Sequence, residues 1–175
     1  MEERELQLLA DRRKIHDLVL RYCRGIDRMD LEAVRGCYEP GGLDHHTGFS
    51  GDRDAFVAWV GEAISRFDGT MHVVANHLAE PEGDEARAET YGVAYHWGTP
   101  SDDPRLNFAS AFRYVDSLRR HGDRWLIRER FAVREWTRAL DGWIPKEGEG
   151  PSGCRGPGDQ VYLAGAPWGT PPPAA

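Results

Sequence analysis

The chain has 175 residues, 40% of them hydrophobic, and carries 29 acidic against 22 basic side chains for a net charge of −7. This length predicts one domain with a substantial core, and an acidic chain without a long basic run excludes nucleic acid as the expected partner. No apolar run approaches the roughly 18 residues of a membrane-spanning helix. The charged N-terminus lacks the apolar core of a signal peptide, so we expect a cytoplasmic protein.

Helical periodicity dominates the first part of the chain. Apolar residues at three- and four-residue spacing predict a helix over residues 5–26, and Asp30 is placed to cap a short second helix that runs to Tyr38. A short strand is expected around residues 43–47. Asp52 is placed to cap a third helix, whose inward face consists of Phe56, Val57, Val60, Ile64 and Phe67.

From residue 70 the pattern changes to alternation, which is typical of strands. The stretches EPEGDE and RRHGDR have turn composition, and GTPSDDP makes a longer loop. Three helices followed by four long strands predict an α+β domain, with the helices on one face of a curved antiparallel sheet. The expected strands cover residues 71–83, 85–98, 106–122 and 123–136.

The last part of the chain, residues 141–175, is rich in Gly and Pro and predicts no regular element. Its apolar residues, such as Trp143 and Tyr162, are too many for a pure linker. We therefore expect a folded domain over residues 1–140 and an extension that packs on its own or a neighbouring subunit.

The stretch GGLDHHTGF places one acid and two histidines side by side. On a strand, Asp44 and His46 face one side and His45 the other, so the two histidines cannot easily share a metal ion. A set of Asp44, His46 and His72 is conceivable as metal ligands, but no HxH or HxxxH spacing supports it, and we expect no metal. His46 is interpreted as a pocket donor or acid–base group with Asp44 as its partner. The alternative is a polar strand end with exposed histidines.

Alternation also sorts the other candidate side chains. His96 and its neighbour Tyr95 lie on opposite faces, so only one can enter a pocket, and His77 is expected to face away from His72. Even-numbered arginines on the last strand, Arg130 among them, share one face, where an arginine either stabilises a developing oxyanion or pairs with glutamates in solvent. Two large aromatic residues, Trp59 and Phe112, are candidates for the wall of an apolar cavity or for plain core.

Two stretches carry a resemblance to a known family. YCRGIDRMDLEAVRGCYEPGGLDHH resembles the opening of SnoaL-like members of the nuclear transport factor 2-like superfamily, and FRYVDSLRRHGDRWLIRER resembles their closing hairpin. The resemblance is a diffuse pattern over residues 5–138. It implies a cone of curved sheet closed by three N-terminal helices. Scytalone dehydratase, bile-acid 7α-dehydratase and hexachlorocyclohexane dehydrochlorinase are the similar enzymes, all cofactor-free lyases.

The resemblance also implies roles for single residues. Asp27 falls where these lyases have an aspartate that orients the catalytic histidine, and His72 falls on that histidine. A neutral imidazole removes a carbon-bound proton well when its far nitrogen donates to a carboxylate. Tyr22 falls on a catalytic tyrosine or lysine. The alternative for Asp27 is a turn-forming aspartate at a helix end, and the alternative for His72 is a core histidine.

The remaining matches are less uniform. His46 falls on a substrate-polarising tyrosine, His96 lies near a second histidine, and Arg130 corresponds to an arginine of the dehydrochlorinase. Ile26 and His46 stand where the scytalone pattern has two tyrosines, so the substrate scytalone is not implied.

The leading hypothesis is a cofactor-independent lyase, of the dehydratase type, acting on a cyclic, polyketide- or steroid-like small molecule. An isomerase or cyclase in the same pocket and a non-catalytic binding module remain open alternatives. Four or more convergent polar groups would favour catalysis over binding. The superfamily implies a homodimer or homotrimer.

Overall fold

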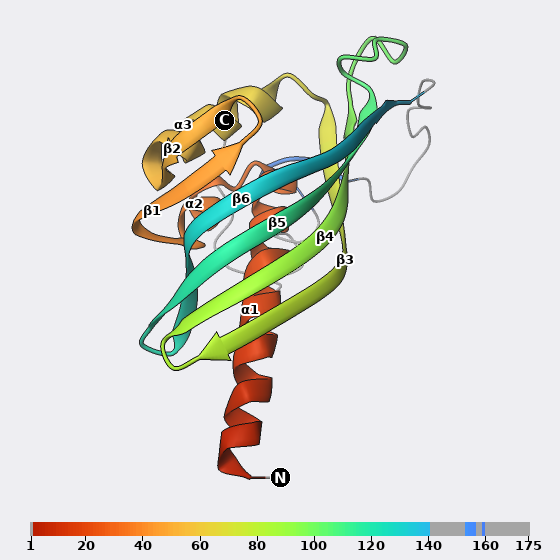
Figure 1. The fold of residues 1–175 in the computed structure, drawn as a ribbon. Helices are drawn as coiled ribbons and strands as arrows, with labels where there is room; N and C mark the ends of the chain where they lie inside the picture. Colours follow the sequence, from red (N-terminus) through yellow and green to blue (C-terminus); the bar gives the residue numbers. More distant parts are fainter. Residues whose placement is uncertain (1, 141–152, 157–158, 160–175) are drawn as a thin grey trace.

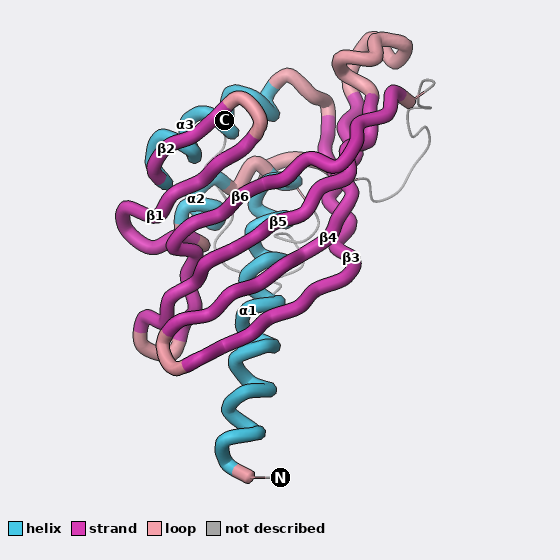
Figure 2. Tube along the Cα trace, viewed as in Figure 1, coloured by secondary structure: helices cyan, strands magenta, loops and turns pink. Residues whose placement is uncertain are grey.

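The computed structural model describes residues 2–140, 153–156 and 159. Within them the chain forms three helices followed or interleaved by six strands (Figures 1 and 2). In chain order these are α1 Glu3–Arg28, α2 Leu31–Arg35, β1 Tyr38–His46, β2 Phe49–Asp52, α3 Arg53–Ser65, β3 Gly69–Glu82, β4 Glu85–Trp97, β5 Phe108–His121 and β6 Arg124–Ala139.

The six strands make one sheet in the order β2-β1-β6-β5-β4-β3. Neighbouring strands are antiparallel except for β1 and β6, which pair in parallel. The sheet curves around α1, which packs against β3 and β6, while α3 packs against β1 and β2 (Figure 1). The predicted α+β class, with helices on one face of a curved sheet, is confirmed.

The end of α1 is fixed tightly against α2. A Cβ atom on Gly25 would lie 2.8 Å from Cγ2 of Val34, so only glycine allows this close approach. Met29 ends the helix in the left-handed conformation, with φ of 57°. The apolar stripe of the helix is buried as the periodicity predicted, and the last turn is held over β3. That turn carries Asp27.

The structure corrects the end of the second helix, adds one short strand and confirms the cap of the third helix. The second helix ends at Arg35, so Tyr38 does not belong to it but begins β1, where its side chain is buried. The short strand β2 was not predicted, because four residues give too little alternation to detect. Asp52 caps α3 as expected, accepting from the backbone N–H groups of Asp54 and Ala55.

A bulge in β3 changes which side chains face the helices. The pairing with β4 shifts register between Val74 and His77. After the bulge, His77 points toward α1, where its ring lies 5.1 Å from that of His16, and its Nδ1 is 2.8 Å from Oγ1 of Thr90. The expectation that His77 faces away from His72 was therefore wrong, since one extra residue reverses the alternation.

The described part of the extension contacts the last residue of α1. The backbone N–H of Gly156 donates to the carbonyl of Arg28 at 3.0 Å, and the Arg28 guanidinium lies 3.5 Å from the Asp159 carboxylate. Trp143 and Tyr162 lie outside the described residues. Within the described part of the chain, no helix is long and apolar enough to cross a membrane.

Candidate active site

A cavity of about 230 Å3 lies between the helices and the concave face of the sheet. Side chains from α1, α3 and five of the strands line it. Most of its wall is apolar, with the expected Trp59 and Phe112 among the lining residues together with Ile26, Ile64, Phe67 and Phe108. Its polar side chains are Tyr22, His46, Thr47, Arg66, His72, His96, Ser110, Tyr114 and Arg134. This composition suits a mostly apolar ligand with a few polar groups.

Asp27 and His72 form a hydrogen-bonded pair at the wall of the cavity. Oδ1 of Asp27 lies 2.6 Å from Nδ1 of His72, and Oδ2 accepts from the backbone N–H of His72 at 2.9 Å. Thr70, two residues earlier on β3, donates from Oγ1 to Oδ1 of Asp27 at 3.2 Å. Asp27 is only 8% exposed. The carboxylate therefore fixes the position of the ring and leaves Nε2 free of that contact.

His46 forms a second pair of the same kind with Asp44. The buried Asp44 carboxylate contacts Nδ1 of His46 with one oxygen and accepts from the Tyr38 hydroxyl at 2.5 Å with the other. Burial, followed by the nearby Tyr22, raises the pKa of Tyr38 well above its usual value, so the phenol stays a donor. His46 itself stacks on Phe56 with ring centroids 5.1 Å apart.

His45 confirms the strand alternation. Its ring stacks on Phe131, with centroids 4.4 Å apart, and its Nε2 lies 3.1 Å from the Glu129 carboxylate, away from His46. Of the three residues conceivable as metal ligands, Asp44 bonds His46 and Tyr38, whereas His72 bonds Asp27. Within the described residues, no three His, Cys, Asp or Glu side chains gather as metal ligands.

Tyr22 lies at the base of the cavity in a cluster of rings. Its ring packs edge-on against Tyr114, with centroids 5.6 Å apart, and the Arg130 guanidinium lies 4.2 Å from its centre. Burial raises the pKa of Tyr22 well above its usual value, with a further contribution from Asp44. Its hydroxyl is therefore neutral and able to donate a hydrogen bond.

His96 enters the cavity as an uncharged ring. It lies between Phe67 and Phe108, with centroids 4.7 and 4.5 Å away. Burial, and next the neighbouring His72, lowers the pKa of His96 to about 3. Its buried Nδ1 has no hydrogen-bond partner among the described residues. A neutral His96 can orient a ligand but cannot supply a proton at neutral pH.

Two predicted substrate-binding residues lie behind the cavity surface. Arg130 is fully buried and does not line the cavity; it makes two hydrogen bonds of 2.7 Å to the Asp116 carboxylate, which neutralises it. Asp44 is likewise fully buried and reaches the cavity only through His46. A direct contact of either residue with a substrate is thus corrected to a supporting position.

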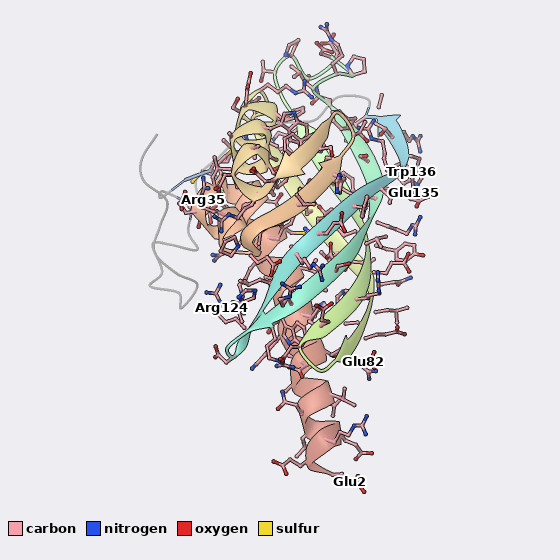
Figure 3. All side chains as sticks on the ribbon, turned by 60° about the vertical axis from the view of Figure 1, so that its left-hand side comes forward. Glu2, Arg35, Glu82, Arg124, Glu135 and Trp136 are labelled. Atoms are coloured by element: carbon pink, nitrogen blue, oxygen red, sulfur yellow. The ribbon has the colours of Figure 1, made fainter. Side chains whose placement is uncertain are left out.

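Two arginines do line the cavity. Arg134 lies four residues after Arg130 on β6, and Arg66 lies at the end of α3. Neither forms an ion pair with any described residue. Alternation placed Arg134 on the inner face but did not distinguish it from Arg130. Arg128 leaves that face at a second bulge and binds Glu85 instead. Further along β6, Glu135 and Trp136 point away from the helices (Figure 3).

The fold and the site define an α+β domain in which helices and a curved sheet border a mostly apolar cavity. The chain belongs to the SnoaL-like family, whose domain model matches residues 7–131. A comparison with functionally curated proteins finds no match.

Several solved structures share the fold. A putative scytalone dehydratase from Novosphingobium aromaticivorans is 20% identical, with a TM-score of 0.66, over 79% of this chain and 97% of that one. The hexachlorocyclohexane dehydrochlorinase LinA-type3 from Novosphingobium barchaimii is 15% identical, with a TM-score of 0.68, over 81% and 99%. The Kfla4162 protein from Kribbella flavida is 18% identical, with a TM-score of 0.67, over 73% and 93%. At these identities the likeness establishes the fold alone.

Proposed function

We propose that the protein is a cofactor-independent lyase that removes a proton and a leaving group from neighbouring carbons of a cyclic, polyketide- or steroid-like molecule. The observation that carries the proposal is the hydrogen bond between Asp27 and His72 at the wall of an apolar cavity. The names of the similar structures, a putative scytalone dehydratase and a dehydrochlorinase, support it.

His72 is the proposed base. With Nδ1 donating to Asp27, the lone pair of Nε2 is available to the cavity. Nε2 takes a proton from carbon, the electron pair of the broken C–H bond forms the double bond, and the leaving group departs with its own electron pair. Asp27 stabilises the imidazolium that forms, and such an assisted base contributes about 10²–10⁴-fold to the rate.

His46 is the proposed acid that protonates the leaving group. Its partner Asp44 compensates the positive charge of a protonated ring, and Tyr38 keeps that carboxylate in place. A hydroxyl then leaves as water. Tyr22, a neutral phenol in the same cavity, is placed to donate a hydrogen bond to a substrate oxygen.

The two lining arginines indicate the kind of carbon acid. Arg134 and Arg66 bring positive charge to the cavity that no carboxylate among the described residues pairs with. A carbon-bound proton becomes acidic beside a carbonyl, whose oxygen gains negative charge as the proton leaves. We propose a substrate with such a carbonyl, its oxygen directed toward Arg134.

An isomerase or cyclase is the second candidate. Two histidine–carboxylate pairs on one cavity also suit a reaction in which one ring takes a proton and the other returns it to a different carbon. A pure binding module is less well supported, because Tyr22, His46, His72, His96 and Arg134 all converge on the cavity.

The test is a panel of hydroxylated ketones and cyclic polyketides incubated in D2O with the wild type and with His72→Gln. Elimination gives a dehydrated product, whereas isomerisation gives an isomer that has taken up deuterium. The lyase proposal expects the dehydrated product with the wild type and none with the variant, whereas an isomer alone would favour the second candidate. Turnover that persists in His72→Gln, or no turnover and no deuterium uptake with any compound, would remove the proposed base from the account.

A homo-oligomer is also proposed. Large apolar side chains, among them Met71, Val73, Tyr91 and Phe131, are exposed on the strands, and all four alternate with residues that face the helices. Burying such a face between copies stabilises an assembly. Analytical ultracentrifugation tests this, and a monomer at all concentrations would contradict it.

A further inference from the structure

A short piece of the C-terminal extension returns to the end of α1 that carries Asp27. Besides the contacts of Gly156 and Asp159 with Arg28, the backbone N–H of Cys154 donates to the Asp159 carboxylate at 3.0 Å. Asp159 is 6% exposed. Residues 153–156 are thereby fixed beside the last turn of α1, on the side from which Arg155 reaches inward.

Arg155 joins the end of α3 to the start of β3. Its Nη1 donates to the carbonyls of Ile64 and Phe67, each at 2.9 Å, and its Nη2 donates to Oγ1 of Thr70 at 3.3 Å. The Ile64 carbonyl lies in the last turn of α3 and also accepts from the backbone N–H groups of Arg66 and Phe67, so these two contacts tie Arg155 to the end of that helix. The third contact goes to a side chain of β3 that itself bonds Asp27.

Thr70 connects this guanidinium to the proposed dyad. Its hydroxyl accepts from Arg155 and donates to Oδ1 of Asp27, the same oxygen that accepts from His72 Nδ1. A hydroxyl has one proton, so an N–H donor on its lone pair fixes the direction in which that proton points. Burial lowers the pKa of Arg155 below its usual value, and the Asp27 carboxylate is the first influence that opposes this shift.

We propose that Arg155 is a positioning residue of the active site, acting through Thr70 to fix the Asp27 carboxylate and hence the His72 ring. Its importance for catalysis rests on the proposed function. The coupling itself does not, because it is a property of the Asp27–His72 hydrogen bond in the resting protein. The described part of the Gly/Pro-rich extension thus contributes to the site through Arg155.

The experiment is proton NMR of the full-length protein, without substrate, following the Nδ1–H resonance of His72. A proton in a 2.6 Å hydrogen bond to a carboxylate resonates far downfield and exchanges slowly with water. The signal is assigned by its loss in His72→Gln. Arg155→Gln should move it upfield and accelerate its exchange by about tenfold. Arg155→Lys, which keeps a cation with fewer fixed donors, should restore part of the effect.

Two controls separate positioning from folding. Arg119→Gln removes an equal charge from an exposed ion pair with Glu85 at the opposite end of the sheet, and should leave the resonance unchanged. Thr70→Val breaks the connection while Arg155 keeps its two carbonyl contacts. In the Thr70→Val background, Arg155→Gln should have no further effect on the His72 signal.

The proposal is overturned if Arg155→Gln loses thermal stability while the His72 resonance and its exchange rate stay as in the wild type. Arg155 would then only cap α3. It is overturned equally if the two substitutions act additively, because the effect would not pass through Thr70. Neither outcome depends on a substrate, so a failure of the lyase proposal in the substrate panel is distinguishable from a failure here.

Discussion

One carboxylate holds both the ring and the main chain of the same histidine: Asp27 accepts from His72 Nδ1 at 2.6 Å and from the His72 backbone N–H at 2.9 Å. The ring cannot turn away without losing the shorter contact, and Asp27 cannot move without disturbing β3. The last turn of α1 and the first residues of β3 are therefore one unit, on which the proposed chemistry depends.

Asp27→Asn tests the role of the charge in that unit. The amide has the size of the carboxylate, but its NH2 group can donate to Nδ1 and so favour the wrong tautomer of His72. We expect kcat/KM to fall by about 10²–10⁴-fold, as for other carboxylate-oriented histidines. Circular dichroism confirms that the variant is folded. Activity within a few-fold of the wild type would show that the carboxylate is not needed.

His46→Gln separates the two histidines. If His72 takes the proton and His46 protonates the leaving group, the variant retains exchange of the substrate's carbon-bound proton with D2O while elimination falls. His72→Gln loses both. NMR of a substrate found in the panel measures exchange and product together. If His46→Gln also loses deuterium exchange, His46 takes part in removing the proton, and the proposed division of roles between His46 and His72 is wrong.

Asp116→Ala tests the correction made for Arg130. Both residues are fully buried in their ion pair, so removing the carboxylate leaves an uncompensated guanidinium in the core. We expect a loss of about 3–5 kcal/mol in the free energy of unfolding, measured with urea. Glu85→Ala is the control, since its ion pairs with Arg119 and Arg128 are exposed and contribute at most about 1 kcal/mol. Equal losses would contradict a buried pair.

His96→Phe tests the environment of the third histidine. The pKa of His96 is about 3 in the folded protein against 6.5 ordinarily, so between these values the unfolded chain binds a proton that the folded chain does not. The free energy of unfolding is therefore unaffected by the titration of His96 above pH 6.5. It falls as the pH drops from 6.5 toward 3, with a slope of up to about 1.4 kcal/mol per pH unit. His77, whose pKa burial also lowers, acts in the same direction.

Phenylalanine keeps a ring between Phe67 and Phe108 but cannot titrate. The variant should therefore have a smaller loss of stability between pH 6.5 and pH 4 than the wild type, as measured by urea unfolding at each pH. An identical pH dependence would mean that His96 is open to solvent in the folded protein.

The sequence pattern predicted those elements of the fold that bury one face. The stripe of α1 and the alternation of the four long strands are periodic because one side of each element is buried, and both predictions are confirmed. The approach of Asp27 to His72 has no such local signal, because 45 residues separate them. That contact was expected only from the family resemblance.

The errors have physical causes of two kinds. A bulge in β3 reverses the side chains after it, which misplaced His77. A bulge in β6 between Ile127 and Glu129 takes Arg128 off the face that alternation would have it share with Arg130. Arg155 lies in a segment without periodicity, so only its long-range contacts with Phe67 and Thr70 reveal it. Thr70 itself could have been found, because it lies two residues before His72 on the same face of the strand.

The tautomer of His72 at neutral pH is the most direct test, measured from the 15N shifts of its two ring nitrogens in the full-length protein. We expect a neutral ring with the proton on Nδ1, bonded to Asp27, and a bare lone pair on Nε2. A ring protonated on Nε2, or an imidazolium at neutral pH, would leave the cavity without a base and refute the proposed role of His72.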